Sequence, residues 1–96
     1  METQKINTAV VILNWNGIDW LKKFIPTIIE KSKEANIYLA DNASSDESVK
    51  FVNDNFSTVK IIQNHANEGF AKGYNDALEN LNEKYFILIN SDMEVT

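Results

Sequence analysis

Short polar side chains follow each of four apolar segments in this 96-residue sequence. In an open parallel sheet, ligands bind beyond the carboxyl ends of the strands, so four such segments on one rim predict a site for a polar ligand. The same residue types are common in turns anywhere, which is the alternative for any single segment. The segments are N-W-N-G at 14–17, D-N-A-S at 41–44, N-H-A-N at 64–67 and N-S-D-M at 90–93.

Asp92 is the candidate metal ligand, because it lies at the end of a hydrophobic segment that predicts a buried strand. Proteins usually hold Mg²⁺ through one or two carboxylates and share it with substrate phosphates. The common phosphate-binding signatures are missing. A single glycine, Gly17, follows the first apolar segment, and no glycine-rich run ends in Lys-Ser/Thr. Phosphate must therefore be bound in another way.

Apolar runs without alternation predict strands that are buried on both faces of a parallel sheet. Between them, apolar residues at helical spacing predict crossover helices of the length that right-handed parallel units need. The fold class is therefore α/β, with an open, mostly parallel, Rossmann-like sheet of four strands and three crossover helices. The predicted strands are residues 8–13, 36–41, 59–63 and 85–89.

The helix boundaries are less regular than the strands. The first predicted helix starts near Asp19 and contains Pro26, which should kink the helix or mark a restart. The spacing of Ser44 and Glu47 matches a capping box, so the second helix should start near Ser45. The third should run from Glu68 onward.

Composition narrows the class of protein. Nine Lys+Arg against 14 Asp+Glu give a net charge of −5, which argues against nucleic acid as a partner. The absence of cysteine excludes disulfides, thiolate zinc sites and a cysteine nucleophile, and favours a cytoplasmic location. The longest apolar runs have five residues, far short of the ~20 that cross a bilayer. We expect residues 1–96 to form one domain.

Four motifs in order resemble the amino-terminal half of the family-two glycosyltransferases, which have the nucleotide-sugar-binding GT-A fold. The resemblance spans residues 8–95, and its specificity lies in the order and spacing of the motifs. It implies inverting transfer of a sugar from a nucleotide-diphosphate sugar to an acceptor hydroxyl, and a strand order of 3-2-1-4. The motifs are V-V-I-L-N-W-N-G, Y-L-A-D-N-A-S-S-D-E-S, N-E-G-F-A-K-G-Y-N-D-A and I-L-I-N-S-D-M-E-V.

The resemblance assigns Asp41, with Asn14 beside it, to the nucleotide base. Asp41 matches the aspartate that hydrogen-bonds the base in this family, commonly uracil or thymine, so a uridine or thymidine donor is implied. A carboxylate suits this role because it accepts a hydrogen bond from a base N–H group. In the alternative reading, Asp41 only shapes the turn with Asn42.

The segment 67–75 resembles the asparagine-and-glycine helix opening of the family. Asn67, Gly69, Lys72 and Gly73 are the implied nucleotide-binding residues, since glycines let backbone approach the ligand and a helix amino terminus favours anions. The sequence departs from the family at Lys72 and Tyr74, where small or amide residues are usual. Lys72 could instead be a solvated lysine, and Gly73 could serve tight packing of the helix on the sheet.

Asn90-Ser91-Asp92 falls where the family has its metal-binding D-x-D element. Asp92 then matches the acid that binds Mg²⁺ or Mn²⁺ across the diphosphate, whereas Asn90 offers only a neutral oxygen. Glu94 is either a second carboxylate for the metal or a solvated acid.

The general base and the acceptor site of this family lie in the half that follows the D-x-D element. We therefore expect residues 1–96 to be a nucleotide-sugar-binding subdomain truncated before the acceptor half, and we assign no catalytic residue. The acceptor of the full protein would be a saccharide or a lipid-linked group, reached in the cytoplasm or, for a longer parent, at the inner face of the membrane. The alternative is a nucleotide-binding module without transfer.

Two further expectations concern the surface. With two helices on one face of the sheet and one on the other, part of the apolar sheet would be uncovered. It would lie beside the last strand, whose outer edge is unpaired. We therefore expect the 96-residue chain to form a homo-oligomer. Trp15 and Trp20 could stack on a base or sugar, but their place beside the first helix favours a position in the core or in a buried interface.

Overall fold

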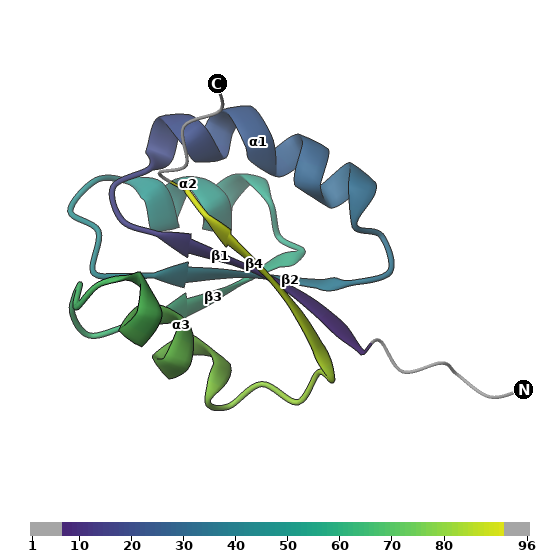
Figure 1. Ribbon diagram of the computed structural model, residues 1–96. Helices are drawn as coiled ribbons and strands as arrows, with labels where there is room; N and C mark the ends of the chain where they lie inside the picture. Colours follow the sequence, from purple (N-terminus) through teal and green to yellow (C-terminus); the bar gives the residue numbers. More distant parts are fainter. Residues whose placement is uncertain (1–6, 92–96) are drawn as a thin grey trace, which may run out of the picture.

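The computed structural model describes residues 7–91 and confirms the α/β fold. Four parallel strands form one open sheet in the order β3-β2-β1-β4, as the family resemblance implied (Figure 1). The elements are β1 (Thr8–Asn14), α1 (Ile18–Lys31), β2 (Asn36–Asp41), α2 (Ser48–Asn55), β3 (Val59–Gln63), α3 (Phe70–Leu78) and β4 (Tyr85–Asn90).

The sheet register brings the polar strand ends together. Asn14 at the end of β1 pairs with Asp41 at the end of β2, and Leu13 pairs with Asn90 at the end of β4. Because all strands are parallel, the loops that follow them emerge at one edge of the sheet, which we call the carboxyl rim. This is the edge at which the sequence predicted a ligand site.

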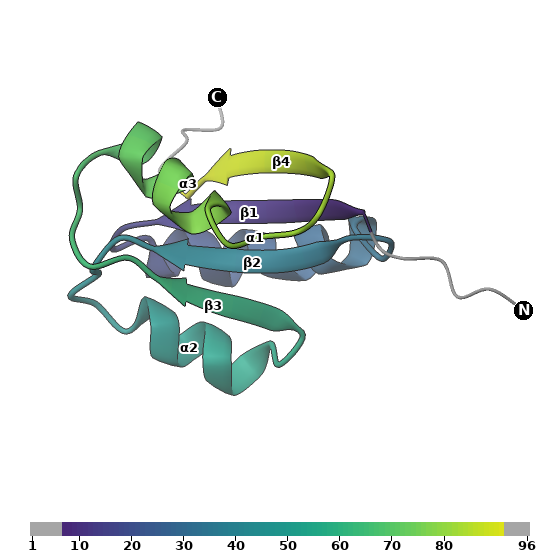
Figure 2. The same ribbon diagram turned by 90° about the horizontal axis from the view of Figure 1, so that it is seen from below.

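Helices cover the two faces of the sheet unequally. α1 and α2 lie on one face and α3 alone on the other (Figures 1 and 2). Along β1, Val10 and Ile12 pack toward α1 and α2, and the intervening Val11 packs toward α3. This alternation places nonpolar side chains on both faces and explains why β1 is apolar throughout. Within residues 7–91, every helix is too short or too polar to cross a lipid bilayer.

β4 is the least protected strand. Four consecutive large side chains, Tyr85 to Leu88, are between 37% and 57% exposed. Consecutive residues of a strand point to opposite faces, so β4 is uncovered on both sides. The apolar surface beside the terminal strand is therefore present as expected, and self-association through it remains a prediction.

Several local expectations were wrong. α2 begins at Ser48 rather than near Ser45, and α3 begins at Phe70 rather than Glu68. α1 continues through the exposed Pro26 without a restart, so the restart was wrong and the alternative, a kink, stays a prediction. Trp15 is 53% exposed and is not a core residue, whereas Trp20 packs partly buried against the core.

Candidate functional site

Asp41 lies at the centre of one polar network on the carboxyl rim. Its side chain is buried, with 1% of the residue exposed. Oδ1 accepts hydrogen bonds from Asn14 Nδ2 at 3.0 Å and Ser44 Oγ at 2.6 Å, and Oδ2 accepts one from the Ser44 amide at 2.9 Å. Asp41 therefore does shape its turn, but with Ser44 rather than Asn42. A carboxylate oxygen can accept two hydrogen bonds, so Oδ2 retains capacity for a ligand N–H.

The loops after β1 and β2 hold each other through Asn16. Its Oδ1 accepts hydrogen bonds from the amides of Ser45 at 2.7 Å and Asp46 at 3.1 Å. The backbone N–H of Asn16 donates a hydrogen bond to Ser44 Oγ at 2.9 Å. Asn16 and Ala43 both have positive φ, 52° and 59°, and for alanine this conformation costs about 1–2 kcal/mol. The hydrogen bonds of Asn16 thus hold the loop after β1 against the turn whose Ser44 bonds Asp41.

Asp46 explains why the predicted capping box does not form. Its Oδ2 accepts a hydrogen bond from the Ile18 amide at the start of α1, at 3.2 Å. Its Oδ1 accepts one from the Ser48 amide at 3.0 Å and another from the Ser48 hydroxyl. One carboxylate therefore lies at the amino termini of two helices, where its charge is favourable. Ser44, the predicted cap, bonds Asp41 instead.

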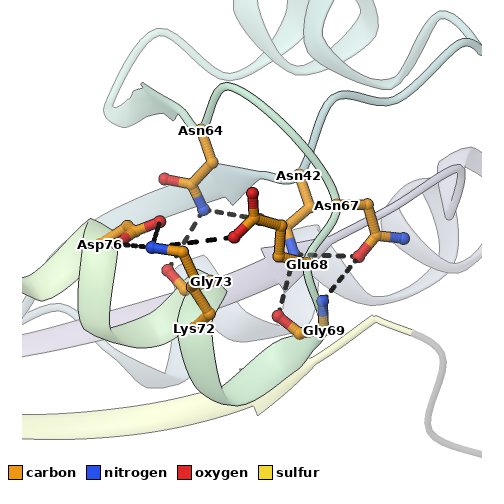
Figure 3. Close-up of polar contacts among 8 residues, drawn as sticks. All are labelled: Asn42, Asn64, Asn67, Glu68, Gly69, Lys72, Gly73 and Asp76. Carbon is orange, nitrogen blue, oxygen red and sulfur yellow. Dashed lines mark hydrogen bonds and ion pairs between the residues drawn. The ribbon is translucent and has the colours of Figure 1, made fainter.

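A second network of amide side chains holds the start of α3 (Figure 3). Asn42 is 2% exposed, and its Oδ1 accepts a hydrogen bond from Asn64 Nδ2 at 2.6 Å. Asn42 Nδ2 reaches Asn67 Oδ1 at 3.4 Å and the Gly69 carbonyl at 3.5 Å. Asn64 Nδ2 also donates to the Gly73 carbonyl at 3.2 Å. The ends of β2 and β3 thereby position the first turn of α3.

The two glycines of this segment differ in their surroundings. A Cβ atom on Gly73 would lie 2.7 Å from Asn42 Nδ2 and 2.8 Å from Leu13 Cδ1, so no side chain fits there. This supports the packing alternative for Gly73. Gly69 has a φ of +90°, and a Cβ there would meet no atom within 4 Å. Gly69 is therefore the position at which backbone is open to an approaching ligand.

Lys72 is engaged by neighbouring carboxylates. Its Nζ lies 3.1 Å from Asp76 Oδ1 and 3.8 Å from Glu68 Oε2, as Figure 3 shows. The hydrogen bond to Asp76, with the charges of Asp76 and Glu68, raises the pKa of the Lys72 ammonium. The side chain is half-exposed, so a phosphate could be bound only in competition with these partners. Its assignment to the nucleotide remains a prediction.

The predicted metal ligand Asp92, and Glu94 with it, lie outside the described residues. Residues 7–91 contain no group of three or more His, Asp or Glu side chains that could hold a metal ion. Ser91, the last described residue, is 2% exposed and donates a hydrogen bond from Oγ to Asn14 Oδ1 at 2.7 Å. The end of β4 is thus tied to the Asp41 network.

A different polar cluster lies away from the carboxyl rim, toward the amino ends of β2 and β4. Glu83 Oε2 accepts hydrogen bonds from Tyr38 Oη at 2.5 Å and Asn36 Nδ2 at 2.8 Å, beside a hollow of about 400 Å³. Burial, the hydrogen bond to Glu83 and the Glu83 charge raise the pKa of Tyr38 to about 12. Burial opposes ionisation of Glu83, but the hydrogen bonds from Tyr38 and Asn36 lower its pKa overall. This cluster joins β2 to the segment before β4.

The structure brings Asn14 and Asp41 together and places Asn67, Gly69 and Gly73 around the adjacent Asn42. Further residues of the site were not singled out from the sequence, although all but Asp46 belong to the four polar segments. Most of their partners lie about 20 to 80 positions away in the chain, which no local pattern specifies, whereas Gly17 and Ser44 also bond Asn14 and Asp41 three positions away. These residues are Asn16, Gly17, Asn42, Ser44, Asp46, Asn64 and Ser91.

Comparison with known proteins gives one family and a consistent fold. Residues 9–96 match the family model described as Glycosyl transferase family 2. The structure is similar to the mannosyltransferase PcManGT from Pyrobaculum calidifontis in complex with GDP-Man and Mn²⁺, with a TM-score of 0.77 and 16% identity. It is equally similar to S. aureus TarS 1-349 in complex with UDP, with a TM-score of 0.77 and 17% identity.

Both alignments cover 90% of this chain and 27% of the other, so the chain spans about a quarter of the length of these structures. No curated protein sequence gives a significant match.

Proposed function

Because the chain belongs to glycosyl transferase family 2, we propose that it forms the donor-binding part of an enzyme that transfers a sugar from a nucleotide-diphosphate sugar to an acceptor hydroxyl. The observation that carries this proposal is the convergence of two polar networks, centred on Asp41 and Asn42, at the carboxyl rim. Ligands of open parallel sheets bind at this edge. The acceptor of the whole protein, a saccharide or a lipid-linked group, and a cytoplasmic location are part of the same proposal.

We further propose that the nucleotide is of the uridine or thymidine type. Uracil and thymine carry a ring N–H that could donate a hydrogen bond to Asp41 Oδ2. Within the described residues, that oxygen accepts a hydrogen bond only from the Ser44 backbone N–H. Since Asp41 is 1% exposed, the base reaches Oδ2 only if the backbone at Ala43 shifts, while the side chains of Asn14 and Ser44 keep their hydrogen bonds to Oδ1. The positive φ of Ala43 lowers the cost of that shift.

The diphosphate would lie toward the start of α3, where Gly69 leaves backbone open and the helix amino terminus favours anions. Glu68 beside it opposes a diphosphate, so a divalent cation fits the charge balance. A single carboxylate with substrate phosphates is an ordinary donor set for Mg²⁺, and Asp92 with Mg²⁺ or Mn²⁺ is our proposal for it. When bound, the cation would neutralise the leaving diphosphate.

Titration calorimetry of the 96-residue chain tests nucleotide binding. We expect UDP and TDP to bind more tightly than CDP, whose base lacks the ring N–H. Asp41→Ala should weaken UDP binding about tenfold or more, because a hydrogen bond to a charged group is worth ~1.5–3 kcal/mol. Asp54→Ala, which removes an exposed carboxylate on α2, is the matched control and should bind as the wild type does. A folded wild-type chain that gives no heat with any nucleoside diphosphate would disprove the proposal.

For the 96 residues by themselves we propose nucleotide binding without sugar transfer. The described rim carboxylates Asp41 and Asp46 belong to the donor-side networks and Glu68 pairs with Lys72, so we assign none of them as the general base. A positioned general base contributes ~10²–10⁴ to rate. With several nucleotide sugars and Mg²⁺ or Mn²⁺, we expect slow donor hydrolysis at most. Acceptor-dependent release of nucleoside diphosphate that Asp92→Asn abolishes would show that the base lies within this chain.

A further inference from the structure

The Asn14 amide is completely buried and uses all of its hydrogen-bonding capacity. Nδ2 donates to Asp41 Oδ1 at 3.0 Å and to Ser44 Oγ at 3.2 Å. Oδ1 accepts from the Gly17 amide at 3.1 Å and from Ser91 Oγ at 2.7 Å. An amide offers two donor hydrogens and two acceptor lone pairs, so no capacity is left for a ligand.

The partners of Asn14 permit only one orientation of the amide. The Gly17 amide can only donate, and an ionised Asp41 carboxylate can only accept. Rotating the amide by 180° would place NH₂ against N–H and oxygen against the carboxylate, at a cost of two buried hydrogen bonds. The backbone at Gly17 thus fixes which end of Asn14 faces Asp41.

Packing leaves this arrangement no room to relax. A Cβ atom on Gly17 would lie 2.6 Å from both Asn14 Oδ1 and Ser91 Oγ. The ends of β1, β2 and β4 and the start of α1 therefore meet at one side chain. A change at Ser91 can reach Asp41 through Asn14, because the two residues bond opposite ends of the same amide.

We infer that Asn14 is a positioning residue of the donor site, which holds the Asp41 carboxylate in place for the base and ties it to Ser91, the residue before the proposed metal ligand Asp92. The inference rests on the proposed function, since it requires that Asp41 contact the base. It differs from direct nucleotide contact by Asn14, for which the amide has no free hydrogen or lone pair.

The test compares UDP with N3-methyluridine diphosphate, in which a methyl group replaces the ring N–H. Wild-type protein should prefer UDP about tenfold in calorimetric Kd. Asn14→Ala should lose most of that preference while binding the methylated nucleotide as the wild type does. If Asn14 had a merely structural role, Asn14→Ala would weaken the binding of both nucleotides equally and leave the ratio of their Kd values unchanged.

Ser91→Ala keeps the inference testable if Asn14→Ala does not fold. Ser91 does not bond Asp41, yet its removal should reduce the preference for UDP about threefold, with no additional effect in the Asn14→Ala background. Ser48→Ala is the matched control, since it removes another buried serine hydroxyl, bonded to Asp46, and should leave the preference intact.

The outcomes separate the two ideas. If the wild type prefers UDP and both Asn14→Ala and Ser91→Ala retain the full preference, the positioning role is wrong and nucleotide binding stands. If the wild type binds both nucleotides equally, Asp41 does not contact the ring N–H and the positioning role fails with it. If a folded wild type binds neither, the proposed function itself is wrong.

Discussion

Replacing Gly73 with alanine should destabilise the fold and disturb the Asn42 network. The added Cβ would lie 2.7 Å and 2.9 Å from the two polar atoms of the Asn42 amide and 2.8 Å from Leu13 Cδ1. Overpacking of this kind costs about 1–3 kcal/mol. If Asn42 moves aside, its 2.6 Å hydrogen bond with Asn64 breaks in a buried place, which costs a further ~1–3 kcal/mol.

The higher helix propensity of alanine opposes this loss of stability. Alanine is favoured over glycine inside a helix by about 1 kcal/mol, so the net decrease in the free energy of unfolding should be about 3 kcal/mol. For a domain of this size the melting temperature should then fall by roughly 12–24 °C. Urea denaturation followed by far-ultraviolet circular dichroism measures the change.

Gly69→Ala is the comparison variant in the same segment. A Cβ there meets no neighbour, so only the positive φ of 90° opposes the substitution, at about 1–2 kcal/mol. A Gly73→Ala protein as stable as the wild type would refute the account of how α3 packs on β1 and β2.

Three other predictions concern the starts of α1 and α2, the exposed strand β4 and the hydrogen bond between Tyr38 and Glu83. Asp46→Ala should lower the free energy of unfolding by about 1–2 kcal/mol, because two helices lose an amino-terminal acceptor, whereas Asp54→Ala should change it little in the same urea titration. The 96-residue chain should self-associate at micromolar concentration in sedimentation velocity, and Ile87→Lys should make it monomeric; a wild-type monomer would contradict this. The pKa of Tyr38, raised to about 12, should fall only part of the way toward 10 in Glu83→Gln, because the burial that contributes most to the shift remains; spectrophotometric titration of both proteins measures the difference. Because the folded pKa is raised, the stability linked to this proton is complete below pH 10 and is lost as pH rises through 12. An unchanged pKa in the variant would count against the Glu83 contact.

The strands were predictable because of how parallel sheets bury them. β2 and β3 have the predicted bounds, and β1 and β4 each extend one residue further, to Asn14 and Asn90. β1 and β2 are buried along almost their whole length, as apolar runs without alternation predict, whereas β4 is equally apolar but exposed within the described residues. In these three strands, the polar residue that ends the apolar run marks the rim. The pairing of Asn14 with Asp41 across that rim follows from parallel register alone.

The helix starts and the supporting residues were not predictable, because their partners come from distant segments. The Ser44 hydroxyl had two competing uses, since its oxygen could accept a hydrogen bond from a free N–H at the start of α2 or its O–H could donate to the Asp41 carboxylate, and in the fold it donates to Asp41. Asp46 serves α1 across 28 positions of sequence. The close contact between Gly73 and Asn42 likewise depends on how α3 packs on β2, which local spacing does not encode.

Binding of a donor nucleotide at the carboxyl rim can be followed residue by residue in a ¹H–¹⁵N correlation spectrum of the 96-residue chain, titrated with UDP and Mg²⁺. We expect shifted amide signals at 14–17, 41–46 and 67–73, with Asn36 and Glu83 near the amino ends of the strands unchanged. Shifts confined to the amino ends of the strands, or none at millimolar UDP, would contradict binding at the rim.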